Sequence, residues 1–399
     1  MNNILKITVL LIAMAGLMVP TAMAEDMLSL GGQMRVRGWY ADDGGDSTAT
    51  WADQRLRIGG KLSIADGVSI TFRTDITESD WGTGNIYGSG RLDKQQWDRA
   101  HLDLDFNAFS LRAGQQLIVL GTTKSFDAQT NGIKFTTKGA VAVTVFGMLQ
   151  DNNIDEEPPG SGNYVNKADG FYYGANVGFG SDAFKSNLYA VGQNKVSNSD
   201  EDVYLLGGNL IFNLDIVKIN GEIDFFTGDA DATTDAMGLQ GFVDVSMDAN
   251  EAFTFGGQLY YAQGDEDDTQ YSVLGNAFDG WDPLFEHGTE LNNEAITPDS
   301  FGYSRRPFEF FGNDSGVMAG RIYVDTKLGD SLTMGASFTY LEPEEDANVD
   351  ADSAITVAAG LKYAVITNTS LGVLVEYIDV DEPDVDEILA GGVGLFVNF

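Results

Sequence analysis

The chain of 399 residues contains no cysteine. A disulfide framework, a lipid-modified N-terminal cysteine and a cysteine-based haem attachment motif are therefore excluded. Histidine is scarce as well: only His101 and His287 are present, and no motif places a serine nucleophile beside either. We therefore expect that the protein is not an enzyme, that it needs no organic cofactor, and that His101 is a hydrogen-bonded residue of a strand.

Positive charge is also in short supply. Lys and Arg number 23 against 60 Asp and Glu, which gives a formal net charge of -37. This balance argues against nucleic acid as a partner. Acidic chains with few aromatic residues are often disordered, but 11% aromatic and 43% hydrophobic content indicate a folded chain here. The 48 glycines favour a β-rich chain with many tight turns.

Long apolar runs are missing outside the first residues. Lys6, the apolar run 7–19 and the small-x-small site Ala22-Met23-Ala24 together predict a secretory signal peptide over residues 1–24. The run is too short to span a bilayer as a helix, although a membrane anchor is the alternative. We expect cleavage near Ala24, export from the cytoplasm and a mature chain beginning near Glu25.

A period of two dominates the mature sequence. In the last segment Leu389, Val393, Leu395, Val397 and Phe399 occupy alternate positions, which predicts a strand with one apolar face. A strand that stops on an aromatic residue resembles the terminal strand of bacterial outer-membrane β-barrels. That resemblance implies that Phe399 is the signal read by the barrel-insertion machinery.

Counting alternating segments gives eighteen candidate strands, an even number that suits a bacterial barrel. We predict an all-β fold, a transmembrane antiparallel up-and-down β-barrel that forms a single domain over residues 25–399. Sixteen strands remain an alternative, because the pairs around 131–150 and 202–227 alternate least clearly, and a soluble sandwich or solenoid is another. The predicted strands are 28–41, 51–64, 68–78, 95–106, 109–119, 131–138, 140–150, 169–180, 183–194, 202–213, 215–227, 236–247, 251–263, 315–328, 331–342, 353–366, 369–380 and 388–399.

The connections alternate between tight turns, such as Asn213-Leu214 and Thr367-Asn368, and longer acidic loops. Short periplasmic turns and long extracellular loops are typical of outer-membrane barrels. The acidic loops suggest divalent cations that bridge them to lipopolysaccharide. Hard oxygen ligands for Ca²⁺ occur together at Asp265, Glu266, Asp267 and Asp268. Solvated charge is the simpler interpretation of that cluster.

Charged residues occupy the face of the strands that should line the lumen, since charge is costly on the lipid face. Ten of the 23 basic residues lie between Met27 and Arg112. We predict a basic wall facing an aqueous channel. The alternative is that these cations simply pair with acids on adjacent strands. The predicted basic positions are Arg35, Arg37, Arg55, Arg57, Lys61, Arg73, Arg99 and Arg112, and the predicted acidic lumen positions are Asp75, Asp103, Asp105, Glu222 and Asp224.

Two loops and a set of aromatic residues have candidate roles. The third external loop, predicted over 120–130, is short, so we expect only a modest inward constriction from it. The extracellular loop 264–313 is unusually long and is predicted to plug or cover the mouth through Trp281, His287, Arg305 and Arg306. A subunit contact or a packed surface flap is the alternative. Candidate girdle residues at strand ends, several of which could equally line the lumen, are Trp39, Tyr40, Trp51, Phe72, Tyr172, Tyr173, Tyr260, Tyr261 and Phe399.

Some segments of the sequence resemble those of known families. Alginate-export-like outer-membrane barrels contain segments similar to residues 111–116 followed by Gly121, and to residues 278–287. Residues 53–121 resemble the porins of sulfate- and metal-reducing bacteria. The resemblance implies an outer-membrane porin, a passive diffusion channel for small hydrophilic solutes or ions, which often forms a homotrimer. A solute-specific or polymer-export barrel, or a barrel sheath around an electron-transfer complex, is the alternative.

Overall fold

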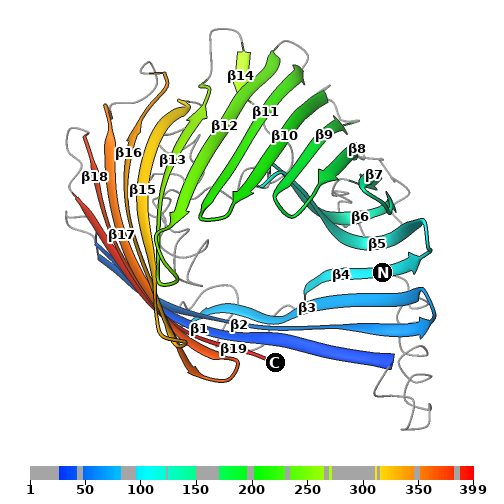
Figure 1. Cartoon of the computed structure of the whole chain (residues 1–399), viewed down its shortest axis with the longest axis horizontal. Helices are drawn as coiled ribbons and strands as arrows, with labels where there is room; N and C mark the ends of the chain where they lie inside the picture. Colours follow the sequence, from blue (N-terminus) through cyan, green and yellow to red (C-terminus); the bar gives the residue numbers. More distant parts are fainter. Residues whose placement is uncertain are drawn as a thin grey trace, which may run out of the picture.

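The computed structural model of the chain describes residues 27–42, 48–81, 96–122, 125–149, 170–195, 202–229, 234–264, 269–271, 311, 315–345, 351–381 and 387–399. Nineteen strands lie within these ranges. Eighteen form a closed antiparallel ring, because β1 pairs with β2 on one side and with β19 on the other. Figure 1 shows the ring, with the blue β1 beside the red β19 where it closes.

The wall strands follow one another around the ring in chain order, so each tight turn or loop joins neighbours. The short strand β14 (Thr269–Tyr271) is the exception. It pairs in parallel with the first residues of β12 and is not one of the eighteen strands that close the ring. The wall strands are β1 (Leu28–Asp42), β2 (Thr48–Ala65), β3 (Val68–Trp81), β4 (Gln96–Asp105), β5 (Phe109–Leu120), β6 (Phe126–Thr137), β7 (Val141–Leu149), β8 (Gly170–Gly180), β9 (Phe184–Lys195), β10 (Asp202–Leu214), β11 (Val217–Asp229), β12 (Asp235–Asp248), β13 (Phe253–Ala262), β15 (Val317–Leu328), β16 (Leu332–Glu342), β17 (Ala354–Ile366), β18 (Thr369–Val380) and β19 (Ile388–Asn398).

The eighteen predicted wall strands are confirmed, and the sixteen-strand alternative is wrong. Several boundaries were predicted wrongly: β2 begins at Thr48 and β3 ends at Trp81, each three residues beyond the predicted strand. Strand β6 already begins at Phe126, so most of the predicted loop 120–130 is strand. The turn between β10 and β11 lies at Asp215 and Ile216, two residues later than predicted, and Asp215 takes a positive φ of 58° there. Asn368, with φ of 61°, occupies the predicted turn before β18.

Alternation of side chains separates the two faces of the wall. In β1 the residues Arg35, Arg37, Trp39 and Ala41 are buried inside the barrel, while Tyr40 between them is exposed on the outside. The same period exposes apolar residues all around the ring; Leu259 and Ile322, for example, are 64% and 65% exposed. An apolar outer face around a polar inner face is the pattern of a barrel that sits in lipid.

No helix within the described residues is long and apolar enough to cross a membrane.

Aromatic residues mark both ends of this outer face. We call the end with the tight turns the short-turn rim and the opposite end the long-loop rim. Phe106 and Phe109 (centroids 4.6 Å apart), and Phe184 and Phe212 (5.1 Å), contact each other at the short-turn rim. At the long-loop rim the exposed tyrosines are Tyr40, Tyr173, Tyr204, Tyr340 and Tyr377. Trp39, Tyr172 and Tyr260 are not part of a girdle; all three are buried inside the barrel, in line with the lumen alternative for these candidates.

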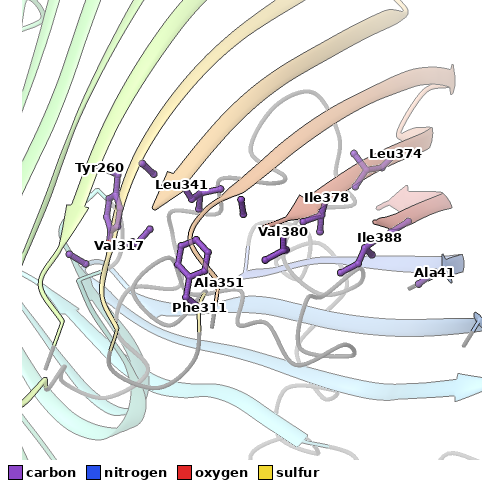
Figure 2. Packing of buried hydrophobic residues seen from close by; sticks show 14 of the residues in the cluster. Ala41, Tyr260, Phe311, Val317, Leu341, Ala351, Leu374, Ile378, Val380 and Ile388 are labelled. Carbon is purple, nitrogen blue, oxygen red and sulfur yellow. The ribbon is translucent and has the colours of Figure 1, made fainter. Parts of the chain in front are cut away.

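Apolar side chains also pack inside the barrel toward the long-loop rim, in two clusters. One draws on β5 to β12, where Phe126 lies 5.6 Å from the ring of Phe146 and 5.3 Å from that of Tyr172. The other draws on β1, β12, β13 and β15 to β19. Figure 2 shows Phe311, from the long loop, among the side chains of this second cluster. The described part of loop 264–313 therefore packs against the inner wall at Phe311 and against β12 through β14.

The ends of the wall meet at Phe399. Its backbone exchanges two hydrogen bonds with Gly32, of 2.7 Å and 3.0 Å. Gly32 has no side chain, and a Cβ there would lie 2.6 Å from the Phe399 ring, so the ring packs directly on the Gly32 backbone. The side chain of Phe399 is 58% exposed, on the outer face of the closing seam.

Candidate functional site

The charged residues predicted for the lumen are carried by five adjacent strands, β1 to β5. Arg35 and Arg37 on β1 are buried within the ring, and Arg55 on β2 lies directly opposite Arg35. Like charges opposite each other across a strand pair repel and are destabilising unless acids offset them. The positions of the acids therefore determine how much of the positive charge of this wall is neutralised.

Asp53 on β2 neutralises the β1 end of the wall. Its carboxylate accepts hydrogen bonds from Arg37 Nε at 2.9 and 3.1 Å and from the indole Nε1 of Trp39 at 2.7 Å. Arg35 Nε lies 4.0 Å away on the same side. Arg37 also stacks over the ring of Trp39, with its Cζ 5.2 Å from the centroid. These contacts fix the guanidinium of Arg37 in one orientation against the wall.

Two irregularities of register bring further acids inward. Between β2 and β3 the register shifts after Leu56, and between β3 and β4 it shifts at Asp98. Arg57 donates two hydrogen bonds to the carboxylate of Asp75, from Nε at 2.6 Å and from Nη2 at 2.7 Å. Asp98 accepts from Arg73 Nε at 2.7 Å and lies 3.3 Å from Arg57 Nη2. A bulge adds one residue to a strand, and this places Asp98 inside the barrel beside Arg99.

Asp103 is the fourth acid of the wall. One oxygen accepts from Arg112 Nε at 2.7 Å and the other from the Thr71 hydroxyl at 2.8 Å. His101 Nδ1 lies 3.2 Å from the second oxygen, and the His101 side chain is buried. His101 is thus a buried wall residue, but its Nδ1 makes no hydrogen bond to the described residues, so the expected hydrogen bond is not found at that atom.

The remaining predicted wall residues differ in their surroundings. Arg55 donates to Gln33 at 3.3 Å. Lys61 is exposed near the short-turn rim. Asp105 pairs with Lys138 at the same rim, where both are largely exposed, so it stands at the barrel edge. Arg99 makes no ion pair with a carboxylate of the described residues.

The predicted acids Glu222 and Asp224 lie on β11, nine strands around the ring from β2 and therefore on the far side of the barrel. Both are buried. Their partners come from the connection between β5 and β6: Ser125 Oγ contacts both carboxylates, and the Thr122 hydroxyl donates to Glu222 at 2.6 Å. The Tyr189 hydroxyl on β9 donates to Asp224 at 2.7 Å. The β5–β6 connection therefore folds into the barrel and is held against the β11 wall.

Several predicted residues lie outside the described residues: Trp281, His287, Arg305 and Arg306 of the proposed lid, and the acidic cluster 265–268 proposed for Ca²⁺. Within the ranges that the structure describes, no group of three or more His, Asp or Glu side chains is arranged to hold a metal ion.

The residues that sequence reasoning missed are mostly the partners of those it found. Asp53 has the same alternation as Arg55 and Arg57, so this signal was available. Asp98 enters the wall through a bulge, which a strict period of two hides. Ser125 and Thr122 reach Glu222 over about a hundred residues of sequence separation, and no local pattern reports such a contact.

No protein-family model matches the chain. No curated protein matches it either. Solved structures with the same architecture are found. Pseudomonas aeruginosa OccK8 (OprE) superposes with a TM-score of 0.62 at 10% identity, over 93% of this chain and 98% of that chain. Acinetobacter baumannii OccAB1 gives 0.60 at 12% identity, over 93% and 96%. Pseudomonas aeruginosa OpdO gives 0.63 at 9%, over 94% and 97%. The chain shares the barrel fold of these proteins along almost its whole length.

Proposed function

We propose that the protein is an outer-membrane porin, a passive diffusion channel for small hydrophilic solutes or ions. One observation carries the proposal: a closed ring of eighteen strands is apolar outside and charged inside. A barrel of this size is wide enough for an aqueous channel, whereas eight strands fill with side chains. The Occ proteins that share its fold are bacterial outer-membrane porins, which supports the same location for this chain.

The distribution of charge inside the ring supports a role in selecting solutes. Basic side chains cover β1 to β5, and Glu222 and Asp224 lie on β11 in the opposite wall, beneath the β5–β6 connection. Charges of opposite sign on opposite walls produce an electric field across the channel, in which a solute with an anionic group is oriented toward the basic wall. The contacts of Asp53, Asp75 and Asp98 hold the guanidinium groups in place and reduce the net charge of this wall.

Single-channel recording in a planar bilayer tests this function. Folded protein should give stable ohmic steps, and replacing Arg35, Arg37, Arg55 and Arg57 together with Gln should shift the reversal potential under a KCl gradient toward cation selectivity. The matched control is Lys218→Gln, which removes a basic residue from an exposed pair with Asp248. Absence of conductance from barrels that migrate as folded on unheated gels would reject the porin. An unchanged reversal potential in the quadruple variant would reject the selective wall alone.

Export and membrane insertion belong to the same proposal. Residues 1–24 have the pattern of a signal peptide, and Phe399 directly follows β19 on the outer face of the ring, where an insertion factor can read it. The first residue of protein extracted from outer membranes should be Glu25. Recovery of a chain that still begins at Met1 would contradict cleavage.

A further inference from the structure

A row of uncharged polar side chains lies on the inner wall of β6 to β10, which stand side by side in Figure 1. Each strand contributes one member of this row, which we call the neutral track: Thr136, Thr144, Asn176, Asn187 and Asn209, in strand order. The members share the inward-facing alternation of the buried cluster on the same strands. Thr144 is two residues from Phe146, for example, and Asn187 is two residues from Tyr189. The track therefore runs along the lumen, between that cluster and the short-turn rim.

Hydrogen bonds between side chains join the members of the track across the strands. The hydroxyl oxygens of Thr136 and Thr144 are 3.1 Å apart. Asn176 Nδ2 lies 3.5 Å from Asn187 Oδ1. Asn187 donates to Asn209 Oδ1 twice, from Nδ2 at 3.0 Å and from its backbone N–H at 3.1 Å. These contacts hold the polar groups in fixed positions along the wall.

The track keeps hydrogen-bonding capacity that its own members do not use. A carboxamide has two N–H donors and an acceptor oxygen, and a hydroxyl donates and accepts. Asn176 and Asn187 each use one N–H within the track, and neither side chain donates to any other group of the described residues. The single contact between Thr136 and Thr144 uses only one of their two protons. All four of these side chains are only partly buried, so a solute in the lumen can reach them.

No member of the track carries a charge, and charged residues mark its two ends. Lys134 precedes Thr136 by two residues on β6, and Glu222 is opposite Asn209 across β10 and β11. Ionic solutes are attracted to such charged groups and to the basic wall of β1 to β5, and not to the track itself. An uncharged solute gains only hydrogen bonds from the wall. Hydroxyl groups suit the track best, because each of them donates and accepts as the track members do.

The spacing of the track suits a solute with several hydroxyl groups. Adjacent strands lie about 4.8 Å apart, so polar groups recur along the wall at about that interval. This interval is close to the length of one sugar ring, and hydroxyls of one molecule can therefore contact neighbouring members together. The track begins beside the β5–β6 connection, because Glu222, which holds that connection, is opposite Asn209. A solute that passes the connection thus meets the track at once.

We propose that the neutral track binds uncharged polyhydroxylated solutes, namely polyols and small sugars, and conducts them along β6 to β10 separately from the basic wall. Such a solute exchanges hydrogen bonds with one member after another, so no single contact is strong enough to trap it. The inference rests on the proposed channel function, to which it adds a substrate class.

Xylitol is the probe, and triethylene glycol is its matched comparison, because the two are uncharged and of nearly equal mass but triethylene glycol has fewer hydroxyl groups. Entry of each solute into proteoliposomes that contain the full chain is followed by swelling. We expect xylitol to enter the wild-type vesicles faster, by roughly three- to tenfold, the effect of one or two hydrogen bonds. The rate of xylitol entry should also saturate as its concentration rises. Because only the ratio of the two rates is compared, a change of pore width that affects both solutes cancels.

Two variants remove members of the track. Asn187→Ala deletes the central carboxamide, and Asn176→Ala deletes its neighbour; each should lower the ratio by roughly threefold. Asn213→Ala is the matched control and should keep the wild-type ratio, since this asparagine is exposed at the short-turn rim, where it donates to the backbone of Asp182.

Measurement of KCl conductance on the same protein separates the two levels of the argument. A channel that conducts KCl but admits both solutes equally, or admits neither, overturns the track and leaves the porin function standing. A ratio that both Asn187→Ala and Asn176→Ala leave unchanged also overturns it. Folded protein without KCl conductance overturns the porin function, and the track with it.

Discussion

Asp53 is the acid whose loss should damage the barrel most. It is the shared acceptor of Arg37 and Trp39, and its side chain is 12% exposed while that of Arg37 is 3% exposed. In Asp53→Ala both donors lose their acceptor, and Arg35 and Arg37 are left with like charge beside Arg55. The neighbouring strands cannot move apart to admit water freely, because β1 pairs along its length with β2 and β19.

The magnitude follows from the geometry. Two unit charges 3 to 4 Å apart attract by about 4 to 6 kcal/mol at an effective dielectric constant near 20. Desolvation offsets much of this attraction in the intact pair, but removing one partner leaves the other charge buried, which typically costs about 3 to 5 kcal/mol. We therefore expect Asp53→Ala to lower the free energy of unfolding by about 3 to 5 kcal/mol. Asp53→Asn should cost less, because the amide oxygen can still accept from Trp39.

The assay is urea unfolding of barrels refolded into phosphatidylcholine vesicles, followed by circular dichroism. A double-mutant cycle with Arg37→Gln isolates the pair, and we expect a coupling of about 2 kcal/mol or more between the two positions. Asp248→Asn is the control, since its pair with Lys218 is exposed, and it should change stability little. A loss below about 1 kcal/mol in Asp53→Ala, the range of exposed pairs, would refute the reasoning.

Two further predictions concern packing and the β5–β6 connection. In Gly392→Ala the new methyl would lie 2.1 Å from Trp39 Cζ3, so we expect a loss of about 1 to 3 kcal/mol in urea unfolding, whereas Gly147→Ala meets open space and should be neutral. Equal effects of the two would contradict the packing at Trp39. Ser125→Ala removes the hydroxyl that contacts both carboxylates of β11, so it should lower stability by about 1.5 to 3 kcal/mol and make single-channel currents noisier. Currents as quiet as those of the wild type would show that this contact does not hold the connection.

The wall of the barrel could be predicted because its signal is local. Each strand places one apolar side chain on every second position, so the period of two reveals both the strand and its outward face. The prediction failed at the start of β6, where Asp127 and Gln129 face outward. These polar residues lie at the long-loop end of β6, beyond the apolar part of the outer face, so the apolar alternation that predicts a strand is absent there. The inner residues Phe126 and Ala128 are buried.

The partners of the charges could be predicted only in part. Alternation placed Arg57 and Asp75 on one face, and the structure joins them. The bulge that turns Asp98 inward depends on how three strands share register, which a single strand does not encode. The contact of Ser125 with Glu222 depends on where a connection folds in space. Such contacts are set by the closed ring as a whole.

The seam between β1 and β19 has a kinetic consequence. Every other backbone pairing in the ring joins wall strands that follow one another along the chain, whereas the seam joins Gln33 to Asn398, 365 residues apart. Contacts of such long separation are the slowest to form, because the chain entropy lost on closing the loop must be overcome before any contact compensates it. The sheet can therefore grow hairpin by hairpin as an open ribbon with two unpaired edges. Until Phe399 reaches Gly32 those edges remain open to other strands, so the last step of folding is also the step at which the barrel is most exposed to misassembly.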